Sequence, residues 1–468
     1  MTKIKWEKFA SETASAGAES ISFYAMRNVP YVRKPVDKEY QSLNIFVPEA
    51  YFSDGSVNGY TTRTAPIFIP NEVGGYMPGD RTQPGVNERG PLSGQANSLF
   101  EALKRGYVVV SPSIRGRTLR SEDGKWSGKA PALIVDMKAA VRFIRHLGDE
   151  LPGDKEKIIT NGTSAGGALS ALAGATGNDP AYREELERIG AWEEKDDIFA
   201  ASCYCPITDL EHADMAYEWE FGSCPDYHRM NMKMEEGGRP SFTPEDGLMT
   251  DKQLEMSKQL RAAFPAYVNG LELQDKDGRA LTLKEDGSGS FRSFVERLIL
   301  ASAQTALDRM QDLSDQKWLK TEDGRSLSMD FDAYAKQITR MKCTPAFDSD
   351  RMDSPENHEF GTETENHLHF TEFALKHDED HEGMAQEAVI RMMNPLASLR
   401  EKTGSPAKYW RIRVGERDRD TSHAVSAILA LTLQMAGCEV DIAYPWDIPH
   451  AGDYDLPELF DWIDSLPR

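Results

Sequence analysis

Short apolar runs alternate with longer stretches of helical periodicity along the first half of the chain. The apolar runs predict buried strands at 65–70, 106–113, 157–164 and 198–206. Apolar residues recur at helical spacing in 131–147, between two of these strands. This alternation predicts an α/β fold, in which a mostly parallel sheet is flanked by helices.

The pattern changes after Cys205 and returns only near the carboxyl end. Residues 206–395 are rich in polar, helix-like sequence with turn signals such as "KDGRA" and "EDGSGS", which favour an insertion over further sheet. We therefore predict a core formed by 1–205 and 396–468, with 206–395 as an inserted domain. The elements expected after the insertion are a strand at 408–418, a helix at 422–437, a strand at 439–446 and an amphipathic helix at 456–466.

A serine lies between two glycines where the strand expected at 157–164 ends. In "NGTSAGG", Gly162 and Gly166 flank Ser164 at G-x-S-x-G spacing. Glycines at these positions allow a sharp turn from strand to helix that raises the hydroxyl above the sheet, whereas a side chain would collide with neighbouring backbone. The amide of Ala165 would then lie at a helix start, where unpaired N–H groups favour negative charge. The motif predicts a nucleophilic serine.

A nucleophilic serine needs a base and an acid, which follow the serine in chain order in this architecture. His450, in "PHAGD", follows the last expected strand and is the candidate base. Asp418 and Asp420 both follow the preceding strand, and in an extended "DRD" their carboxylates point to the same side, so spacing does not decide which one is the acid. Glu416 and Asp447 are weaker candidates.

A second donor to the oxyanion is expected from a loop after an earlier strand. "NEVGGYMPG" follows the strand at 65–70 and contains paired glycines, so we nominate the amide of Gly75.

Charge and cysteine content restrict the partners and the compartment. The formal net charge is -22 and the pI is about 5.0, which argue against nucleic acid or an anionic membrane as partners, because such surfaces need clustered Lys and Arg. Five cysteines are few and odd in number, as is typical of reduced thiols. Neither a secretory signal nor a membrane-spanning segment is recognisable. We expect a cytoplasmic monomer, although a chain from which a leader had been removed would show the same pattern.

Two histidines in the insertion raise the question of a metal. In a strand, His367 and His369 would share a face, with carboxylates nearby. The segment contains neither a closed zinc motif nor a calcium loop. We therefore expect a solvated surface here, with no metal and no cofactor.

With these residues in hand, the chain resembles the bacterial tannases, which are tannin acyl hydrolases of the α/β-hydrolase superfamily. The resemblance implies a hydrolase core with a large inserted lid domain, with Ser164 as nucleophile, Asp418 as acid and His450 as base. Fungal tannases and feruloyl esterases place cysteines where this chain has Thr163 and Ala451, so the bacterial branch is the better match. The likeness runs through nearly the whole length and includes "VGGYMPG", "IITNGTSAGGALSALAGA", "LEHADMAYEW", "SPEN", "WRIR", "DRDTS" and "PWDIPHAGDYDL".

The resemblance also implies a substrate. In the family, a lysine, a glutamate and a second aspartate bind the phenolic hydroxyls of a galloyl ring, and the matching positions are Lys342, Glu356 and Asp420. From the residues alone, Lys342 and Glu356 would be assigned to a solvated lid surface. The expected activity is hydrolysis of galloyl esters of tannins and of simple gallate esters, through a galloyl-enzyme. The alternatives are a feruloyl or other phenolic-ester esterase and, from a different class, a non-catalytic binding protein on a hydrolase scaffold.

Overall fold

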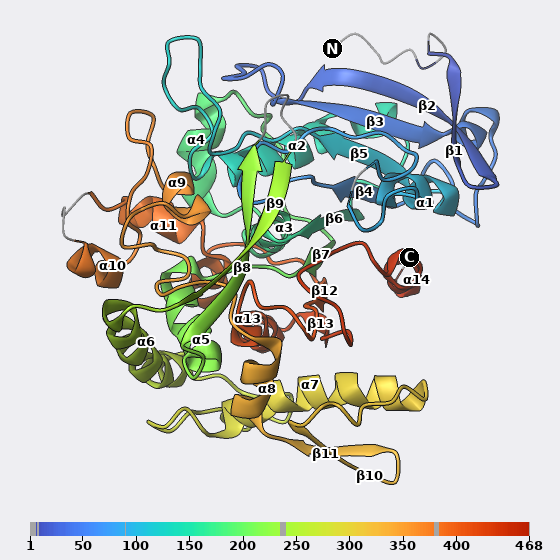
Figure 1. Ribbon diagram of the computed structural model, residues 1–468. Coiled ribbons are helices and arrows are strands. Elements are labelled where there is room, and N and C mark those ends of the chain that lie inside the picture. Colours follow the sequence, from blue (N-terminus) through green and yellow to red (C-terminus); the bar gives the residue numbers. More distant parts are fainter. Residues whose placement is uncertain (1–5, 7–8, 89, 235–239, 379–382, 468) are drawn as a thin grey trace.

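A nine-stranded sheet forms the centre of the protein (Figure 1). The computed structural model describes Trp6 and residues 9–88, 90–234, 240–378 and 383–467. From β5 onward all neighbouring strands are parallel, whereas the β1–β2, β2–β3 and β3–β5 pairs are antiparallel. The predicted mostly parallel sheet is therefore confirmed. In spatial order the strands are β1 (Ser11–Ala16), β2 (Glu19–Pro30), β3 (Ser42–Pro48), β5 (Val108–Pro112), β4 (Ile67–Pro70), β6 (Ile158–Thr163), β7 (Ala200–Tyr204), β12 (Tyr409–Arg413) and β13 (Glu439–Ala443).

Helices cover both faces of this sheet, as the strand register demonstrates. Phe68 on β4 packs against Phe460 of α14, whereas Ala201 on β7 lies against Gly174 of α3. On the intervening strand β6, Phe68 pairs with Ile159 and Ala201 pairs with Thr160. Because consecutive residues of a strand point to opposite faces, Phe68 and Ala201 also point to opposite faces of the sheet. The helices of the core are α1 (Ser98–Arg105), α2 (Ala132–His146), α3 (Ala165–Ala175), α4 (Arg183–Arg188), α12 (Pro395–Glu401), α13 (His423–Met435) and α14 (Leu456–Ser465).

The three antiparallel strands at one edge were not predicted, since the sequence pattern identified no strand before residue 65. Side chains on β1 alternate between exposed and partly buried positions, and the β2–β3 register shifts between Met26 and Val29. Strands β1 and β2 lack the continuous apolar run that identifies a strand buried on both faces, whereas β3 was missed although it is buried along its whole length.

The insertion adds helices and two separate hairpins. Among the described residues, 206–395 contribute no strand to the central sheet. Its apolar residues, including Trp219 and Phe264, belong to the same buried cluster as the strands. In Figure 1 its helices α6, α7 and α8 lie at the opposite end of the molecule from β1–β3. The insertion comprises α5 (Leu210–Phe221), β8 (Asp226–Met234), β9 (Pro240–Leu248), α6 (Asp251–Gly270), α7 (Ser290–Asp308), β10 (Leu319–Glu322), β11 (Arg325–Met329), α8 (Phe331–Ile338), α9 (Pro355–Glu359), α10 (Glu372–His377) and α11 (Glu387–Met392).

No helix in the described part of the chain is both long enough and apolar enough to cross a membrane.

Candidate active site

Ser164 occupies a strained turn between β6 and α3. Its backbone has φ 60° and ψ -123°, a conformation that residues other than glycine rarely adopt. The Ser164 amide donates to the Tyr204 carbonyl at 2.9 Å, and the Ser164 carbonyl accepts from the Ala168 amide at 2.8 Å. The strand β7 and the first turn of α3 thus hold the side chain at the carboxyl edge of the sheet.

The flanking glycines are required by close backbone contacts. A Cβ on Gly162 would lie 2.3 Å from the Gly166 carbonyl oxygen, and one on Gly166 would lie 2.7 Å from the Val73 carbonyl oxygen. Both separations are far below van der Waals contact, so neither position has room for a side chain. The structure thus supports the steric reason given for the G-x-S-x-G motif.

Asp418, rather than Asp420, contacts Nδ1 of the candidate base, His450. Nδ1 of His450 donates to Oδ2 of Asp418 at 2.8 Å, and Asp418 is fully buried. Glu416 and Asp447 lie apart from the imidazole: the Glu416 carboxylate accepts from the Asp447 amide at 3.3 Å, and the Asp447 side chain is exposed. The geometry therefore separates Asp418 from Asp420, which sequence spacing did not, and also from the two weaker candidates.

The loop that carries His450 packs directly against the end of β6. A Cβ on Gly452 would lie 1.8 Å from Oγ1 of Thr163, the residue before Ser164. Two residues earlier on the same strand, the side-chain amide of Asn161 donates to Asp453 at 2.9 Å. These two contacts bring the candidate base and the candidate nucleophile to the same edge of the sheet, although they lie far apart in the sequence.

Nε2, the ring nitrogen of His450 that does not contact Asp418, is the candidate atom for proton transfer. Within the described part of the chain, the buried Nε2 has no hydrogen-bond partner, and Oδ2 of Asp420 lies 3.6 Å away. Burial disfavours the charged imidazole, but Asp418 and Asp420 outweigh this effect and raise the pKa of His450 well above its usual value. The base form of His450 therefore increases as the pH rises.

The three residues assigned to the galloyl ring line one cavity with Ser164. This cavity has a volume of about 630 Å³, and its wall includes Gly75, Lys342, Glu356 and Asp420. Ser164 and two residues of the segment 206–395, Lys342 and Glu356, therefore face the same space. The size falls within the range of small-molecule sites.

An ion pair and a buried carboxyl group lie side by side in the wall of this cavity. Nζ of Lys342 lies 2.6 Å from Oδ1 of Asp420. Burial opposes ionisation of Asp420, but Lys342 and His450 outweigh it and lower the pKa of Asp420 to about 2. Burial raises the pKa of Glu356, despite the opposing charge of Lys342. Phenolic hydroxyls can donate to carboxylates and accept from an ammonium group, so this set suits adjacent hydroxyls on one ring.

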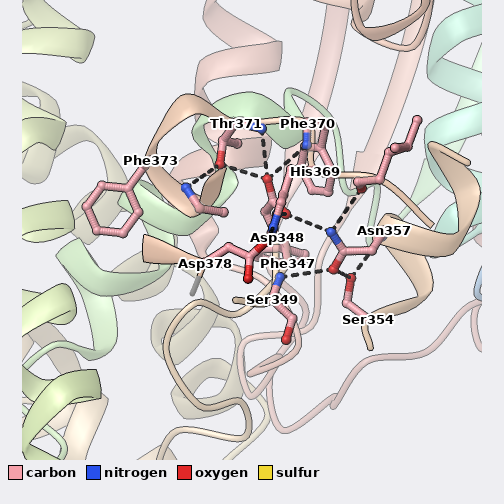
Figure 2. A network of polar contacts seen from close by, with 12 residues as sticks. Phe347, Asp348, Ser349, Ser354, Asn357, His369, Phe370, Thr371, Phe373 and Asp378 are labelled. Atoms are coloured by element: carbon pink, nitrogen blue, oxygen red, sulfur yellow. Dashed lines mark hydrogen bonds and ion pairs between the residues drawn. The ribbon is translucent and has the colours of Figure 1, made fainter. Parts of the chain in front are cut away.

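A buried network around Asp348 holds the segment that carries Glu356 (Figure 2). The Asp348 carboxylate accepts hydrogen bonds from Asn357 Nδ2 at 2.7 Å, the Phe370 amide at 2.9 Å and the Thr371 amide at 2.8 Å. Asn357 follows Glu356 on α9, so the network fixes this short helix. No local sequence pattern identifies Asp348, because its partners lie up to 23 residues away in the chain.

A second buried carboxylate, Asp214 on α5, also binds the backbone of this segment. It accepts from the amides of Phe347 at 2.9 Å and Asp348 at 3.0 Å. Burial raises the pKa of Asp214 to about 7, although these backbone hydrogen bonds oppose the shift. Only the fold brings Asp214 to this segment, and the string "LEHADMAYEW" that contains it gave no indication of this role.

The expected solvated surface around His367 and His369 is wrong for His369. This imidazole is fully buried, with Nδ1 2.7 Å from Asp348 and Nε2 3.4 Å from Asp378. Its carboxylate partners come from segments that fold back on one another, which local spacing does not reveal. His367 is half-buried, and its ring stacks on His358 at 5.7 Å.

The described residues contain one group of possible metal ligands, formed by Cys205, Asp418 and His450. One potential ligand atom from each residue lies within 4.8 Å of the other two. Asp418 and His450 already share a hydrogen bond, and the Cys205 thiol donates to the Ala451 carbonyl at 3.3 Å. We therefore interpret this group as the candidate acid–base pair with a neighbouring thiol.

Three comparisons with known proteins give consistent results. A family model described as BD-FAE matches residues 74–235. Tannase from Lactobacillus plantarum superposes with a TM-score of 0.94 at 46% identity, and that from Fusobacterium nucleatum with 0.93 at 43%; each alignment covers 98% of both chains. A tannin acyl hydrolase in complex with ethyl gallate superposes with a TM-score of 0.92 at 45% identity, over 99% of this chain and 98% of the other.

Curated esterases match over a shorter region. Esterase LipC of Mycobacterium tuberculosis is 34% identical over 125 residues, which is 27% of either chain. Esterase LipQ of the same organism is 35% identical over 157 residues, which is 33% of this chain and 32% of LipQ. The fold and these relatives define a carboxylic ester hydrolase with the α/β-hydrolase fold. The full-length likeness to solved tannases is more specific, and the chain belongs to the bacterial tannase family.

Proposed function

We propose that this protein hydrolyses galloyl esters, releasing gallic acid from hydrolysable tannins and from simple alkyl gallates. The observation that carries the proposal is that Ser164 shares its cavity with the Lys342–Asp420 ion pair and the buried Glu356. The likeness to a tannin acyl hydrolase in complex with ethyl gallate supports the same assignment.

The proposed reaction begins with proton transfer from Ser164 to Nε2 of His450 as the hydroxyl oxygen attacks the ester carbonyl. The amides of Ala165 and Gly75 donate to the oxyanion, and Asp418 orients the imidazole and stabilises its charge. His450 then returns the proton to the leaving alcohol, and a galloyl-enzyme remains. Water, deprotonated by His450, attacks this ester, and gallic acid leaves as Ser164 regains its proton.

Substrate selection follows from the hydroxyl-binding groups. We propose that Lys342, Glu356 and Asp420 bind the three adjacent hydroxyls of the galloyl ring. An acyl group without these hydroxyls would leave buried polar groups unpaired, which carries a desolvation penalty in the transition state. Such a site discriminates more strongly than an apolar pocket, because the missing hydrogen bonds are not replaced by water.

We further propose that 206–395 acts as a lid on the core formed by 1–205 and 396–468. The support is that Lys342 and Glu356 come from the insertion, while the nucleophile and the acid–base pair come from the core. All groups that the reaction requires belong to the chain itself, so we propose no cofactor. The five free cysteines support a reducing, cytoplasmic location, and we expect a monomer.

The test is to incubate the purified protein with methyl gallate or methyl ferulate and to follow the released acids by chromatography. We expect release of gallic acid, a clear preference for methyl gallate and loss of activity in Ser164→Ala. A preference for ferulate would instead support a feruloyl esterase. If the protein bound gallate esters without cleaving them, it would be a binding protein.

A further inference from the structure

Arg117 contacts the loop that carries the proposed oxyanion donor Gly75. Its Nε donates to the Gly75 carbonyl at 2.8 Å, and its backbone amide donates to the Tyr76 carbonyl at 2.9 Å. One residue therefore fixes two consecutive carbonyl groups. Arg117 is half-buried and lies in the loop that follows β5. It therefore contacts the Gly75 loop, which follows β4, from a separate segment of the chain.

The Gly75 loop needs such support because its backbone is strained. Gly75 has φ 54° and Tyr76 has φ 57°, and the second value is unfavourable for a residue with a bulky side chain. The Gly74 carbonyl accepts from the Met77 amide at 3.0 Å. Because the peptide is planar and trans, the Gly75 N–H must point away from that hydrogen bond. The contacts on both sides of Gly75 thus set the direction of its N–H group.

The same guanidinium reaches the helix that carries Glu356. Its Nη1 lies 3.1 Å from Nδ1 of His358, two residues after Glu356 on α9. Burial lowers the pKa of His358 to about 4, and Arg117 contributes to the shift. The imidazole is therefore neutral at working pH, and its Nδ1 can accept a hydrogen bond from the guanidinium.

We propose that Arg117 is a positioning residue that aims the Gly75 amide at the developing oxyanion and couples this loop to the Glu356 helix. The inference rests on the proposed function only in assigning Gly75 as an oxyanion donor and Glu356 as an acyl-binding group. A guanidinium suits this task because its planar fork donates in two fixed directions at once. The single ammonium of a lysine keeps the charge but does not hold both partners in this geometry.

The test compares Arg117→Lys and Arg117→Met with Arg120→Met. Arg120 lies in the same segment, is exposed and stacks on Trp126 at 3.7 Å, so it is a matched control. We expect both Arg117 variants to lower kcat on methyl gallate by about 10- to 100-fold, below the loss that follows removal of a whole oxyanion donor. KM should change little, and Arg120→Met should behave as the parent.

A second readout separates positioning from a merely structural role. A trihydroxyphenyl trifluoromethyl ketone forms a tetrahedral adduct with the serine, whereas gallate occupies the site without an oxyanion. The Arg117 variants should lose affinity for the ketone in parallel with kcat and retain affinity for gallate. Equal losses for the two ligands, or an unchanged kcat in Arg117→Met, would overturn the proposal.

The contact between Arg117 and α9 is tested separately with His358→Leu, which removes the acceptor on that helix. We expect this variant to raise KM for methyl gallate more than it lowers kcat, and an unchanged KM would refute the coupling. If the parent cleaves another ester in preference to methyl gallate, the proposed substrate fails. The Arg117 comparison is then made on that ester, with the same kcat and ketone criteria.

Discussion

Oδ2 of Asp420 lies 3.6 Å from Nε2 of His450, the nitrogen that faces away from Asp418, and Oδ1 of the same carboxylate forms a 2.6 Å ion pair with Lys342. Asp420 therefore belongs both to the groups proposed to bind the acyl ring and to the surroundings of the candidate base. A phenolic hydroxyl that donates to Asp420 would weaken its attraction for the imidazolium. Recognition of the ring and strength of the base are thus linked through one side chain.

Asp420→Asn should shift the pH dependence of the enzyme. The groups facing the His450 imidazole are the carboxylates of Asp418 and Asp420 and the thiol of Cys205. The carboxylates raise the pKa of His450, and activity needs the neutral base, so removing one charge should move the rising limb of kcat/KM to lower pH. The measurement is a pH profile on nitrophenyl acetate, which lacks phenolic hydroxyls on its acyl group. A limb that stays in place or moves to higher pH would argue against the link.

The same variant should impair the phenolic substrate. At a pH above the rising limb, we expect Asp420→Asn to lower kcat/KM for methyl gallate by about 10- to 150-fold, equivalent to about 1.5–3 kcal/mol for a hydrogen bond to a charged group. Steady-state kinetics on methyl gallate and nitrophenyl acetate provide the check, with exposed Asp447→Asn as control. Equal losses on both esters would contradict the assignment of Asp420 to the ring.

Asp418→Asn should abolish most of the turnover on every ester. This change removes the acceptor of the Nδ1 hydrogen bond and favours the wrong tautomer of His450, which lowers kcat by about 10⁴-fold in serine hydrolases of this type. The measurement is kcat on methyl gallate and nitrophenyl acetate beside Asp447→Asn. Retention of activity would show that another carboxylate serves the base.

The buried His423–Glu220 pair should make stability depend on pH. Nδ1 of His423 lies 2.8 Å from Glu220, and Nε2 donates to the Gly415 carbonyl at 3.1 Å, which ties α5 to the loop before Asp418. Burial opposes the charge, but Glu220 outweighs it and raises the pKa of His423 to about 9. A raised pKa stabilises the fold at low pH, and this contribution disappears as the pH rises through about 9.

Denaturant unfolding at pH 7 and pH 10 tests this pair. We expect the parent to lose free energy of unfolding between these values. Glu220→Gln should cost about 3–5 kcal/mol at pH 7, because it leaves a buried imidazole without its counter-charge, and less at pH 10. Similar losses at both pH values would mean that the pair is not ionised.

Asp348→Ala should loosen the helix that carries Glu356. The variant removes the partner of buried His369 Nδ1 and one of the two acceptors of the Asn357 side-chain amide, which we expect to cost about 3–5 kcal/mol of unfolding free energy. KM for methyl gallate should rise, because Glu356 loses its fixed position. Thermal unfolding and steady-state kinetics provide the test. An unchanged KM in a folded variant would show that the network does not support the acyl site.

Local chemistry explains which features the sequence predicts. The turn at Ser164 is specified by glycines within two residues of it, so the motif, the preceding strand and the following helix were all identifiable. The choice between Asp418 and Asp420 as the acid could not be predicted. It depends on how the loop that carries both aspartates packs against His450 at the edge of the sheet. The resemblance named Asp418, and the contact with Nδ1 gives the physical reason.

Features built from distant segments escaped the sequence analysis. Lys342 and Glu356 lie in polar sequence without a motif, and only the family resemblance singled them out. His369 was expected in solvent because its partners, Asp348 and Asp378, come from separate parts of the segment 206–395. Arg117 lies beside Gly75 only after the chain has folded, and the partly exposed strands β1 and β2 lack the continuous apolar runs that marked the inner strands.

The central claim is that Ser164 carries the acyl group during turnover. The most direct measurement is to quench the enzyme in acid during hydrolysis of ethyl gallate and to locate covalent adducts by peptide mass spectrometry. We expect a galloyl ester on Ser164 that is absent from Ser164→Ala. Undiminished gallate release by Ser164→Ala, with no adduct on this residue in the parent, would contradict the account.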